Sequence, residues 1–243
     1  MDGNTQDSAV ALLEREAVVG QKRPGTKLYL TVKRCFDFVS SFCVSVVLLL
    51  PLTVLALMVV IKDFGSPFYA QKRVGMHGKD LFILKLRSMR RGADNLEKML
   101  SPEQLEEYRK EYKLEDDPRL IGYQKPGDGS RCFGSVIRKT SLDELPQILW
   151  NICIKGNMSV VGPRPILREE LEANYTKQEQ ALLLSVKPGL TGYWQAYARN
   201  DATYETGERQ RMELYYVHNC SIGLDIKILF ATVVAVLKGR GAN

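Results

Sequence analysis

Hydrophobic residues are distributed unevenly along this chain, and the longest apolar run lies near its start. Between Phe38 and Ile61 no residue is charged, and Val, Leu, Phe and Ala dominate. A helix of about 24 residues is about 36 Å long, which is enough to cross a bilayer core of about 30 Å. Because a buried core helix does not need this length, the pattern predicts a membrane segment.

A proline in the middle of this run affects how the segment enters a membrane. Pro51 removes a helix hydrogen bond and clashes with the preceding turn, so we expect a bend there. Basic residues flank the run on both sides, and the positive-inside rule therefore identifies no outside end. They are Lys22, Arg23, Lys27, Lys33 and Arg34 before it, and Lys62, Lys72, Arg73 and Lys79 after it. Balanced flanks favour a re-entrant helix that breaks at Pro51, and a kinked single span remains the alternative. Hydroxyl groups that could satisfy the freed backbone belong to Ser40, Ser41, Ser45 and Thr53.

After the membrane segment, the pattern changes to short stretches. Phe68 to Arg73 and Leu81 to Leu86 are typical of strands, and the glycine-containing loop between them predicts a β-hairpin. From Asp94 to Leu114, apolar residues recur near helical spacing. Ser101-Pro102 interrupts this stretch, which therefore predicts a pair of helices.

The C-terminal third begins with a predicted helix from Thr176 to Val186, which Pro188 and Gly189 end. Aromatic and basic residues follow in a predicted loop: Tyr193, Trp194, Tyr197 and Arg199. Such residues could stack on a nucleotide base or lie at a membrane interface, and ordinary packing is the alternative.

The last apolar segment, Ile222 to Leu237, is interrupted by Asp225 and Lys227. Its uncharged part is only about ten residues, whereas about 20 are needed to span a bilayer. Lys238 and Arg240 follow it. The pattern predicts an interfacial helix that docks on anionic lipids.

Composition and charge narrow the class of protein. The 243 residues suit one catalytic domain with an appendage, and 45% hydrophobic and 26% charged residues are ordinary for a folded chain. A net charge of +6 favours an anionic partner, either nucleic acid, a membrane surface or a phosphorylated substrate. Five cysteines without a CxxC pair indicate a reducing compartment and argue against a disulfide framework or a zinc site. Residues 1–30 are expected to form a flexible tail, without the apolar core of a signal peptide.

The segment from Ile137 to Pro165 carries the most chemistry, and two adjacent carboxylates lie in it. Ser141-Leu-Asp-Glu144 matches the capping-box pattern, so Ser141 is predicted to cap a helix and Glu144 to bond back to it. Asp143 has no such explanation, and a helix N-terminus would favour its ionised form. An anionic aspartate can bind a metal ion or attack phosphorus.

Basic side chains complete an arrangement suited to phosphate chemistry. Arg138 precedes the acids, and Arg164 follows in a Gly-Pro-Arg-Pro turn whose prolines would hold the backbone rigid. A carboxylate and a phosphate diester repel one another, so attack would need Mg²⁺ and arginines. The cluster after the second strand could bind phosphates or lipid headgroups: Lys85, Arg87, Arg90 and Arg91.

With these motifs, the sequence resembles the bacterial sugar transferase family, the monotopic phosphoglycosyl transferases. The resemblance runs from about Lys33 to Leu237, in blocks that follow the family's order. They are KRCFD, the apolar run with its proline, GSPFYAQKRVG, KLRSM, IRKTSLDELPQ, KGNMSVVGPRP, KPGLTGYWQ and LDIKILF. The resemblance implies a re-entrant membrane helix, a catalytic Asp-Glu dyad, Mg²⁺ dependence and a covalent aspartyl-phosphosugar intermediate.

Carried over residue by residue, the resemblance implies that Asp143 is the nucleophile and a Mg²⁺ ligand, with Glu144 completing the dyad. Four basic residues match positions that handle phosphates and the uridine nucleotide: Lys85, Arg87, Arg138 and Arg164. Pro51 matches the break in the family's membrane helix.

The chain departs from the family pattern at three places. Leu50 stands where the family often has a serine before the proline, and Asn157 stands where it usually has an aspartate. The stretch between Gln147 and Gly162 is slightly longer than usual, which leaves the placement of Arg164 open.

The sequence therefore predicts an α/β monotopic membrane enzyme, mostly helical with a small β-hairpin. The expected parts are a tail over residues 1–30, a re-entrant helix over 31–62 and a catalytic domain over 63–243. The resemblance implies transfer of a sugar 1-phosphate from a UDP-sugar to undecaprenyl phosphate, with release of UMP, as the first membrane step of exopolysaccharide, capsule or glycoconjugate assembly. The resemblance also implies that the enzyme lies on the cytoplasmic face of a bacterial inner membrane. Its expected partners include the phospholipid bilayer but no nucleic acid. A homodimer and the identity of the sugar are left open.

Two alternatives remain beside this interpretation. One is a membrane-anchored module that binds anionic lipid without catalysis. The other is direct transfer without a covalent intermediate, in which Asp143 and Glu144 only hold the metal ion.

Overall fold

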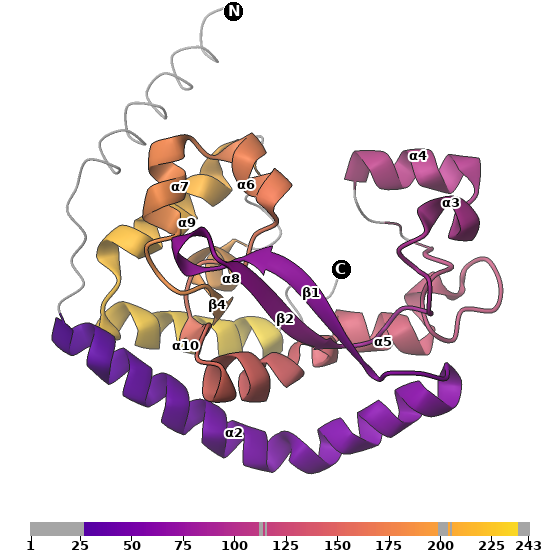
Figure 1. Cartoon of the computed structure of the whole chain (residues 1–243), viewed down its shortest axis with the longest axis horizontal. Coiled ribbons are helices and arrows are strands. Elements are labelled where there is room, and N and C mark those ends of the chain that lie inside the picture. The colour runs from indigo at the N-terminus through magenta and orange to yellow at the C-terminus, as the bar shows by residue number, and fades with distance from the viewer. Residues whose placement is uncertain (1–26, 112–113, 115, 199–203, 205, 238–243) are drawn as a thin grey trace, which may run out of the picture. The chain divides into compact units, whose positions relative to one another are not determined.

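The structure is a computed structural model that describes residues 27–111, 114, 116–198, 204 and 206–237 (Figure 1). It divides into two compact units. Of the described residues, the first unit comprises 27–43, 72–83, 148–198, 204 and 206–237, and the second comprises 44–71, 84–111, 114 and 116–147. Residues 1–26 of the predicted tail, Arg199, Lys238 and Arg240 lie outside the described residues.

Helices make up most of the described chain, which confirms the prediction of a mostly helical protein with a small β component. The α-helices are α2 (Lys27–Lys62), α3 (Leu96–Met99), α4 (Pro102–Glu111), α5 (Phe133–Lys139), α6 (Arg168–Asn174), α7 (Lys177–Leu183), α8 (Tyr193–Tyr197), α9 (Glu208–Asn219) and α10 (Ile222–Leu237). Short 3₁₀ turns are η1 (Met76–Gly78), η2 (Asp128–Ser130) and η3 (Leu142–Glu144), and η4 (Ile148–Ile154) is a π-helix. The strands are β1 (Phe68–Val74), β2 (Asp80–Leu86), β3 (Ser159–Val161) and β4 (Gly189–Thr191).

Helix α2 contains the whole apolar run. Its most apolar 18-residue window has a mean hydropathy of 3.0, and 6% of that window is buried. Among the described residues, α2 is the one helix that is long and apolar enough to cross a membrane, judged by length and composition. Pro51 lies inside it, and the helix continues through this proline to Lys62.

Of the four hydroxyl groups expected to compensate for Pro51, three bond within their own turns, and the buried Oγ of Ser45 has no hydrogen-bond partner among the described residues. Ser40 donates to Phe36 O, Ser41 to Phe38 O and Thr53 to Leu49 O. The helix carbonyl that a proline leaves without its donor lies four residues earlier, at Val47. Because these three hydroxyls donate elsewhere, they do not compensate for the missing bond.

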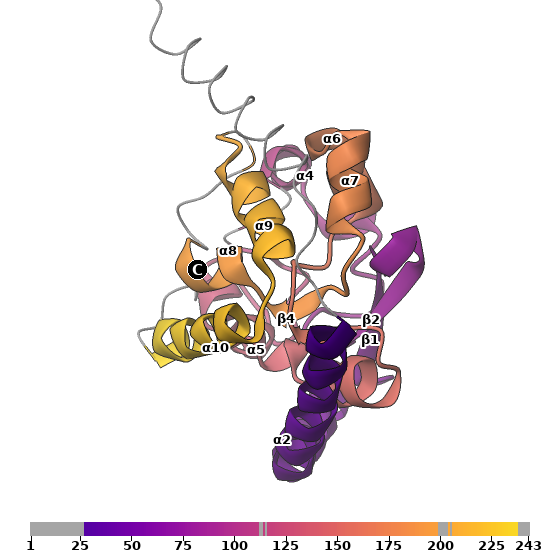
Figure 2. The same cartoon turned by 90° about the vertical axis from the view of Figure 1, so that its left-hand side faces the viewer.

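The first unit is built around a two-stranded parallel sheet in which Ser159 pairs with Gly189 and Val161 with Thr191. The two strands approach closely, since a Cβ at Gly189 would lie 2.1 Å from the backbone nitrogen of Gly162. Helix α10 packs against both strands, α8 contacts α9 and α10, and α7 contacts α9 (Figures 1 and 2). The sequence pattern did not predict this sheet, because strands of three residues are too short to show alternation.

Two buried aspartates join the first part of α2 to the rest of the first unit. The Asp37 carboxylate accepts from Ser159 Oγ (2.8 Å) and from the backbone N–H of β3 (2.9 Å). Asp225, on α10, accepts from Tyr29 Oη (2.9 Å), Lys33 Nζ (2.7 Å) and Tyr216 Oη (2.8 Å). The charge that interrupts the apolar pattern of the last helix is therefore a buried link to α2.

The second unit has its own apolar core. Val59 from α2, Leu86 from β2 and Ile137 from α5 pack together with Ile121, and each is at most 1% exposed. Strands β1 and β2 form the predicted β-hairpin, and α3 and α4 confirm the predicted helical pair on either side of Ser101. The second part of α2 is thus held to this unit through Val59.

One predicted loop is a helix in the structure. The segment with Tyr193, Trp194 and Tyr197 forms α8. Trp194 is 8% exposed, and α8 is held between α9 and α10. Packing of this aromatic side chain stabilises a helix where the composition had predicted a loop. This stabilisation comes from tertiary contacts, which the local sequence does not show.

Candidate active site

The two adjacent carboxylates follow α5 in the second unit, at a turn that the sequence did not predict. Ser141 has a positive φ of 56°, and its side chain makes no capping bond. The backbone then forms the short 3₁₀ turn η3, in which the N–H of Glu144 donates to the carbonyl of Ser141 (3.1 Å). The predicted capping box is therefore wrong, because a left-handed Ser141 cannot present its hydroxyl to the turn.

Lys85 is the cation that this turn brings to both acids. Its Nζ lies 2.9 Å from Glu144 Oε1 and 3.4 Å from Asp143 Oδ2. Lys85 comes from β2, where the neighbouring Leu86 points into the apolar core. Strand alternation thus places the ammonium on the face opposite the core. Asp143 is 9% exposed, whereas the Glu144 side chain is 36% exposed.

Burial, more than the backbone of the turn, controls the proton affinity of Asp143. Burial raises its pKa above the ordinary aspartate value, Lys85 lowers it, Glu144 raises it, and Arg138 lowers it. The sequence had suggested a shift in the other direction, through a helix N-terminus. That suggestion is wrong, because η3 is a single 3₁₀ turn and the side chain is removed from water.

The other two predicted basic residues of this unit are placed differently. Arg138 is exposed in the last turn of α5, and its charge acts on Asp143. Arg87 donates from its guanidinium to the carboxylate and the carbonyl of Asp63, and from Nε to Ser66 O (2.8 Å). The charge of Arg138 therefore acts on the acids, whereas Arg87 binds Asp63 and Ser66 in the segment that follows α2.

Arg164 belongs to the first unit, where it joins a second group of charges. Three arginines lie within 3.9 Å of the Glu170 carboxylate: Arg73 (3.9 Å), Arg164 (3.9 Å) and Arg209 (3.3 Å). A second carboxylate, Glu213, lies 3.9 Å from Arg209 Nε. We call these five residues the arginine cluster. Apart from Arg164, its members were missed in the sequence, and the i, i+4 pair Arg209–Glu213 was the local signal that could have found them.

Aromatic rings cover the arginine cluster. The Arg209 guanidinium lies 4.2 Å from the ring centre of Trp194 and 4.0 Å from that of Tyr204, and Arg164 lies 5.8 Å from that of Trp194. Stacking of this kind holds a guanidinium plane in one orientation. Stacking of Trp194 on a nucleotide base stays a prediction, and the Arg209 guanidinium lies over its ring.

Glu213 is the most deeply buried acid of the cluster. Burial raises its pKa to about 7, while Arg209 and then Arg164 lower it. Tyr175 Oη donates to its Oε2 (3.3 Å). The three arginines of the cluster exceed its two carboxylates in charge, and the raised pKa of Glu213 increases this excess near neutral pH.

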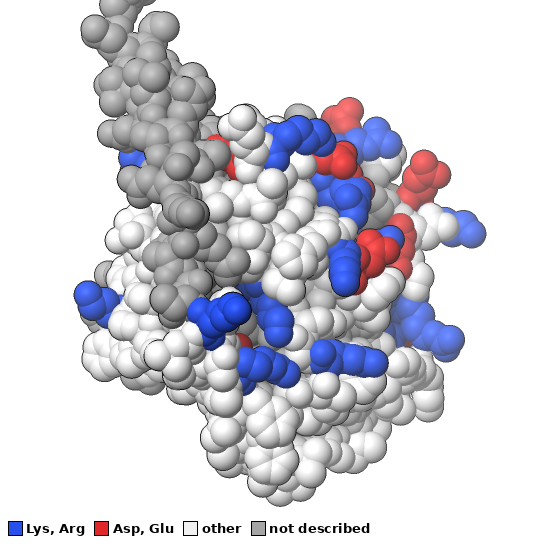
Figure 3. Space-filling view, turned by 60° about the vertical axis from the view of Figure 1, so that its left-hand side comes forward, with Lys and Arg blue, Asp and Glu red and all other residues white. Residues whose placement is uncertain are grey.

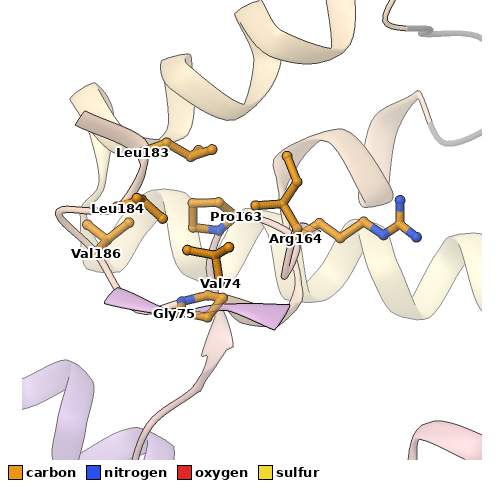
Figure 4. A pocket seen from close by; sticks show the side chains of 9 residues that line it. Val74, Gly75, Pro163, Arg164, Leu183, Leu184 and Val186 are labelled. Carbon is orange, nitrogen blue, oxygen red and sulfur yellow. The ribbon is translucent and has the colours of Figure 1, made fainter. Parts of the chain in front are cut away.

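A small pocket lies beside the Gly-Pro-Arg-Pro turn in the first unit. Its lining is mostly apolar and comes from the end of β1, the turn and the end of α7: Val74, Gly75, Pro163, Arg164, Ile166, Leu183, Leu184, Val186 and Pro188. Figure 4 shows the Arg164 side chain extending away from Leu183, Leu184 and Val186. Pro163 of the turn therefore lines the pocket, and the guanidinium of Arg164 points away from its apolar lining.

The two acids suit a magnesium ion only in a particular way. No group of three or more Asp, Glu, His or Cys side chains that could hold a metal ion is found among the described residues. Mg²⁺ commonly uses one or two carboxylates and fills its other positions with waters and substrate phosphates. Asp143 and Glu144 fit that mode, because the single ammonium of Lys85 leaves one carboxylate charge unbalanced.

The departures near η4 have structural consequences. Asn151 Nδ2 donates to Asn157 Oδ1 (3.2 Å) and to Phe82 O (2.8 Å), so Asn157 serves the backbone arrangement of the first unit. The slightly longer stretch winds as the π-helix η4, with Lys155 N bonded to Trp150 O. A π-helix accommodates an extra residue within helical structure.

Comparison with known proteins gives consistent matches over nearly the whole chain. A family model described as "Bacterial sugar transferase" matches residues 28–239. A UDP-galactose-lipid carrier transferase of Erwinia amylovora is 42% identical over 214 residues, which cover 87% of this chain and 41% of that protein. The exopolysaccharide production protein ExoY of Sinorhizobium fredii is 40% identical over 214 residues, which cover 86% of this chain and 87% of that protein. An undecaprenyl-phosphate galactose phosphotransferase of Salmonella typhimurium is 41% identical over 87% of this chain and 41% of its own length. The chain thus spans less than half of two of these relatives and most of the third.

Proposed function

We infer the function from the family, because this chain belongs to the bacterial sugar transferase family and is an enzyme of the phosphoglycosyl transferase class. We propose that it transfers a sugar 1-phosphate from a UDP-sugar to undecaprenyl phosphate and releases UMP, in exopolysaccharide, capsule or glycoconjugate assembly. The observation that carries the proposal is the buried Asp143 carboxylate beside Lys85 and Glu144.

The proposed reaction has two steps. An Asp143 oxygen attacks the β-phosphorus of the UDP-sugar, the bond from that phosphorus to the bridging oxygen breaks, and UMP leaves with the bridging oxygen. A phosphate oxygen of undecaprenyl phosphate then attacks the phosphorus of the aspartyl-phosphosugar. The carboxylate of Asp143 leaves, and the product is a polyprenol diphosphate sugar.

The surroundings of Asp143 suit this role. An attacking carboxylate must be ionised, and Lys85 and Arg138 favour the ionised form against the effect of burial. A nucleophile that is largely removed from water also needs less desolvation when the substrate arrives. We propose that Glu144 holds the Lys85 ammonium in place.

We propose that Mg²⁺ is the cofactor and that Asp143, together with Glu144, holds it. When bound, the ion would neutralise charge on the phosphate oxygens. Lys85 and Arg138 are the protein's own cations at this site, and they would bind the remaining phosphate oxygens.

The arginine cluster supports the binding of an anionic donor. Its three guanidinium groups exceed its two carboxylates in charge, and protonation of Glu213 increases the excess. Arg164 is the most exposed of the three, with 36% of its side chain accessible, against 12% for Arg73 and 10% for Arg209. We propose that Arg164 contacts the nucleotide diphosphate and that Glu170 and Trp194 hold its guanidinium in place.

We propose that the enzyme is monotopic, lies on the cytoplasmic face of a bacterial inner membrane and inserts α2 as a re-entrant helix. In support, most of the apolar surface of α2 is exposed. On α10, four apolar side chains are 46–72% exposed at a spacing that puts them on one face: Ile222, Ile226, Phe230 and Val233. This face suits an interfacial helix. Labelling of a cysteine placed in the N-terminal tail, in sealed vesicles, tests the topology, and labelling from the periplasmic side would contradict it.

The test of the function is UMP release from a panel of UDP-sugars, including UDP-galactose, with and without Mg²⁺. The wild type should release UMP and Asp143→Ala should not, while its far-UV circular dichroism is unchanged. A lipid-binding module without catalysis predicts salt-dependent binding that survives Asp143→Ala and no UMP release from the wild type. Radiolabelled sugar phosphate on the protein before lipid is added distinguishes the covalent route from direct transfer.

A further inference from the structure

A pair of cations in the first unit has no part in the reaction proposed above. Arg34 lies on α2 one turn before Asp37, so the two side chains share a face of the helix. Both oxygens of the Asp37 carboxylate accept hydrogen bonds from β3, at 2.8 and 2.9 Å. The N–H of Ser159 in β3 donates in turn to the carbonyl of Pro188 (2.9 Å), which follows Lys187 in the chain. These contacts bring Arg34 and Lys187 to the same end of β3.

The charges at this place are not balanced. Lys187 is half-buried; its burial and then the charge of Arg34 lower the pKa of its ammonium group, whereas Asp37 raises it. The Arg34 guanidinium donates to a neutral acceptor, the carbonyl of Ile152 (3.0 Å). The carboxylate that acts on Lys187 already accepts two hydrogen bonds from β3. An anion bound between the two cations would relieve their repulsion.

The surface next to these cations has the character of a membrane interface. Phe38, one turn after Arg34, is 49% exposed. Trp150 and Ile154 belong to η4, whose Ile152 carbonyl Arg34 binds, and they are 39% and 57% exposed. The ammonium of Lys155 lies 5.0 Å from the ring centre of Trp150. Figure 3 shows Lys and Arg side chains gathered beside a broad surface without charged side chains. Tryptophan and lysine beside apolar surface are typical of the headgroup level of a bilayer.

We propose that Arg34 and Lys187 bind the phosphate group of a membrane lipid, whose chains lie against the exposed apolar side chains of α2. A guanidinium and an ammonium are the groups that proteins use to bind phosphate. The phosphate could belong to a phospholipid headgroup or to an isoprenoid phosphate, since both present the same anion beside apolar chains. An isoprenoid phosphate here would be the acceptor of the proposed function, and only that assignment rests on the transfer reaction; a phospholipid site is independent of it.

The test uses the full chain in nanodiscs of phosphatidylcholine, doped in one arm with phosphatidylglycerol and in the other with farnesyl phosphate. Native mass spectrometry of the released protein measures how much doped lipid it retains at each mole fraction. Lys187→Gln removes one charge and keeps an unbranched polar side chain with a shorter apolar stem. Because a charged hydrogen bond to phosphate is lost, half-maximal retention should need about tenfold or more doped lipid.

Three further variants keep the test decisive. Lys187→Arg retains the charge and should retain lipid within about twofold of the wild type. Lys177→Gln removes an exposed lysine from α7 in the same unit and should also behave as the wild type. Asp143→Asn should retain lipid normally while losing turnover, which separates this proposal from the proposed function.

The two arms identify the source of the phosphate. A loss of retention in Lys187→Gln confined to farnesyl phosphate assigns the site to an isoprenoid phosphate, and a loss that includes phosphatidylglycerol assigns it to membrane phospholipid. Unchanged retention of both lipids in Lys187→Gln overturns the proposal. So does equal loss in Lys187→Arg, because the effect would then come from shape and not from charge.

Discussion

The acidic pair with Lys85 and the arginine cluster are both built from carboxylates and cations, but they differ in net charge. Carboxylates are in excess in the first group, and cations are in excess in the second. In the second unit, one ammonium, that of Lys85, serves two carboxylates, Asp143 and Glu144. In the arginine cluster of the first unit, three guanidinium groups share Glu170, and the second carboxylate, Glu213, has a pKa raised to about 7. A group with spare carboxylate suits attack on phosphorus or metal binding, whereas a group with spare cations suits holding an anion.

Burial acts in both places with different results. It raises the pKa of Asp143 and that of Glu213. Beside Asp143, Lys85 and Arg138 lower the pKa, so the buried acid has cations that favour its reactive form. In the arginine cluster, neutralising Glu213 increases the net positive charge. The same desolvation thus acts on the proposed nucleophile in one unit and on the proposed anion site in the other.

The largest expected effect comes from Asp143→Asn. It removes the attacking oxygen and keeps the shape of the side chain, so kcat for UMP release should fall about 10⁴-fold or more. Glu144→Gln should lower kcat less, by about 10² to 10³-fold, because Glu144 supports the site without attacking. Glu169→Gln, on the exposed surface of α6, is the matched control and should be unaffected. A larger loss in Glu144→Gln than in Asp143→Asn would exchange the two roles.

Arg164→Lys tests whether the arginine cluster binds the donor. The charge is kept, but the planar fork and its position near Trp194 are lost, so KM for the UDP-sugar should rise about 10 to 100-fold with a smaller change in kcat. Initial rates over a range of UDP-sugar concentrations separate the two constants. Arg168→Lys, an exposed arginine of α6 paired with Asp80 at 3.8 Å, is the control. An unchanged KM in Arg164→Lys would remove the cluster from donor binding.

Lys85→Met should move the acid limb of the pH–rate profile. Asp143 must be ionised to attack, so activity falls as the pH drops through its pKa. Lys85 lowers that pKa, and its removal should shift the acid limb of kcat/KM to higher pH. Lys98→Met, on exposed α3, should leave the limb in place. A shift to lower pH would show that the titrating group is not Asp143.

Glu213→Gln should have the smallest effect of these variants, and the affected quantity is the pH dependence of stability. The pKa of Glu213 is raised in the folded protein to about 7 from an ordinary value of 4.5, so the folded state holds this proton more tightly than the unfolded state. Its contribution to stability is complete below the unfolded pKa and is lost as the pH rises through the folded pKa, by about 1.4 kcal/mol per pH unit at most. The glutamine variant should therefore show a flatter dependence of Tm on pH between about 4.5 and 7 than the wild type. An equal slope in both would mean that another group titrates.

The sequence predicted the elements with strong local patterns and missed those made by packing. The hairpin of β1 and β2, the pair α3 and α4, and the long apolar helix α2 follow from periodicity, proline and composition. The capping box at Ser141 was wrong because the same four residues can form a 3₁₀ turn with a left-handed start. The β3–β4 pair was missed because its strands are too short to show side-chain alternation. Their pairing depends on the close approach of Gly162 and Gly189, which no local pattern shows.

The family resemblance drawn from motifs is confirmed, whereas the roles of the site residues remain predictions. The family resemblance implied that Asp143 and Glu144 form a catalytic dyad and that Lys85 handles phosphates, and the structure brings these three together. It does not bring Arg87 to the carboxylates, because its guanidinium is bound to Asp63. Arg73, Arg209 and Glu213 carry no motif that marks them, and only their convergence on the surroundings of Glu170 makes them a group.

By itself, the sequence determined that this protein has a long apolar helix, a net positive charge and an acidic pair with basic neighbours, because charge, hydrophobicity and motif order are local properties of the chain. Tertiary structure decided which acid is buried, which cation serves it and which carboxylate gains a proton near neutral pH. These depend on desolvation and on distances between side chains far apart in the sequence, such as Lys85 and Glu144 or Lys33 and Asp225, and no local pattern encodes either quantity.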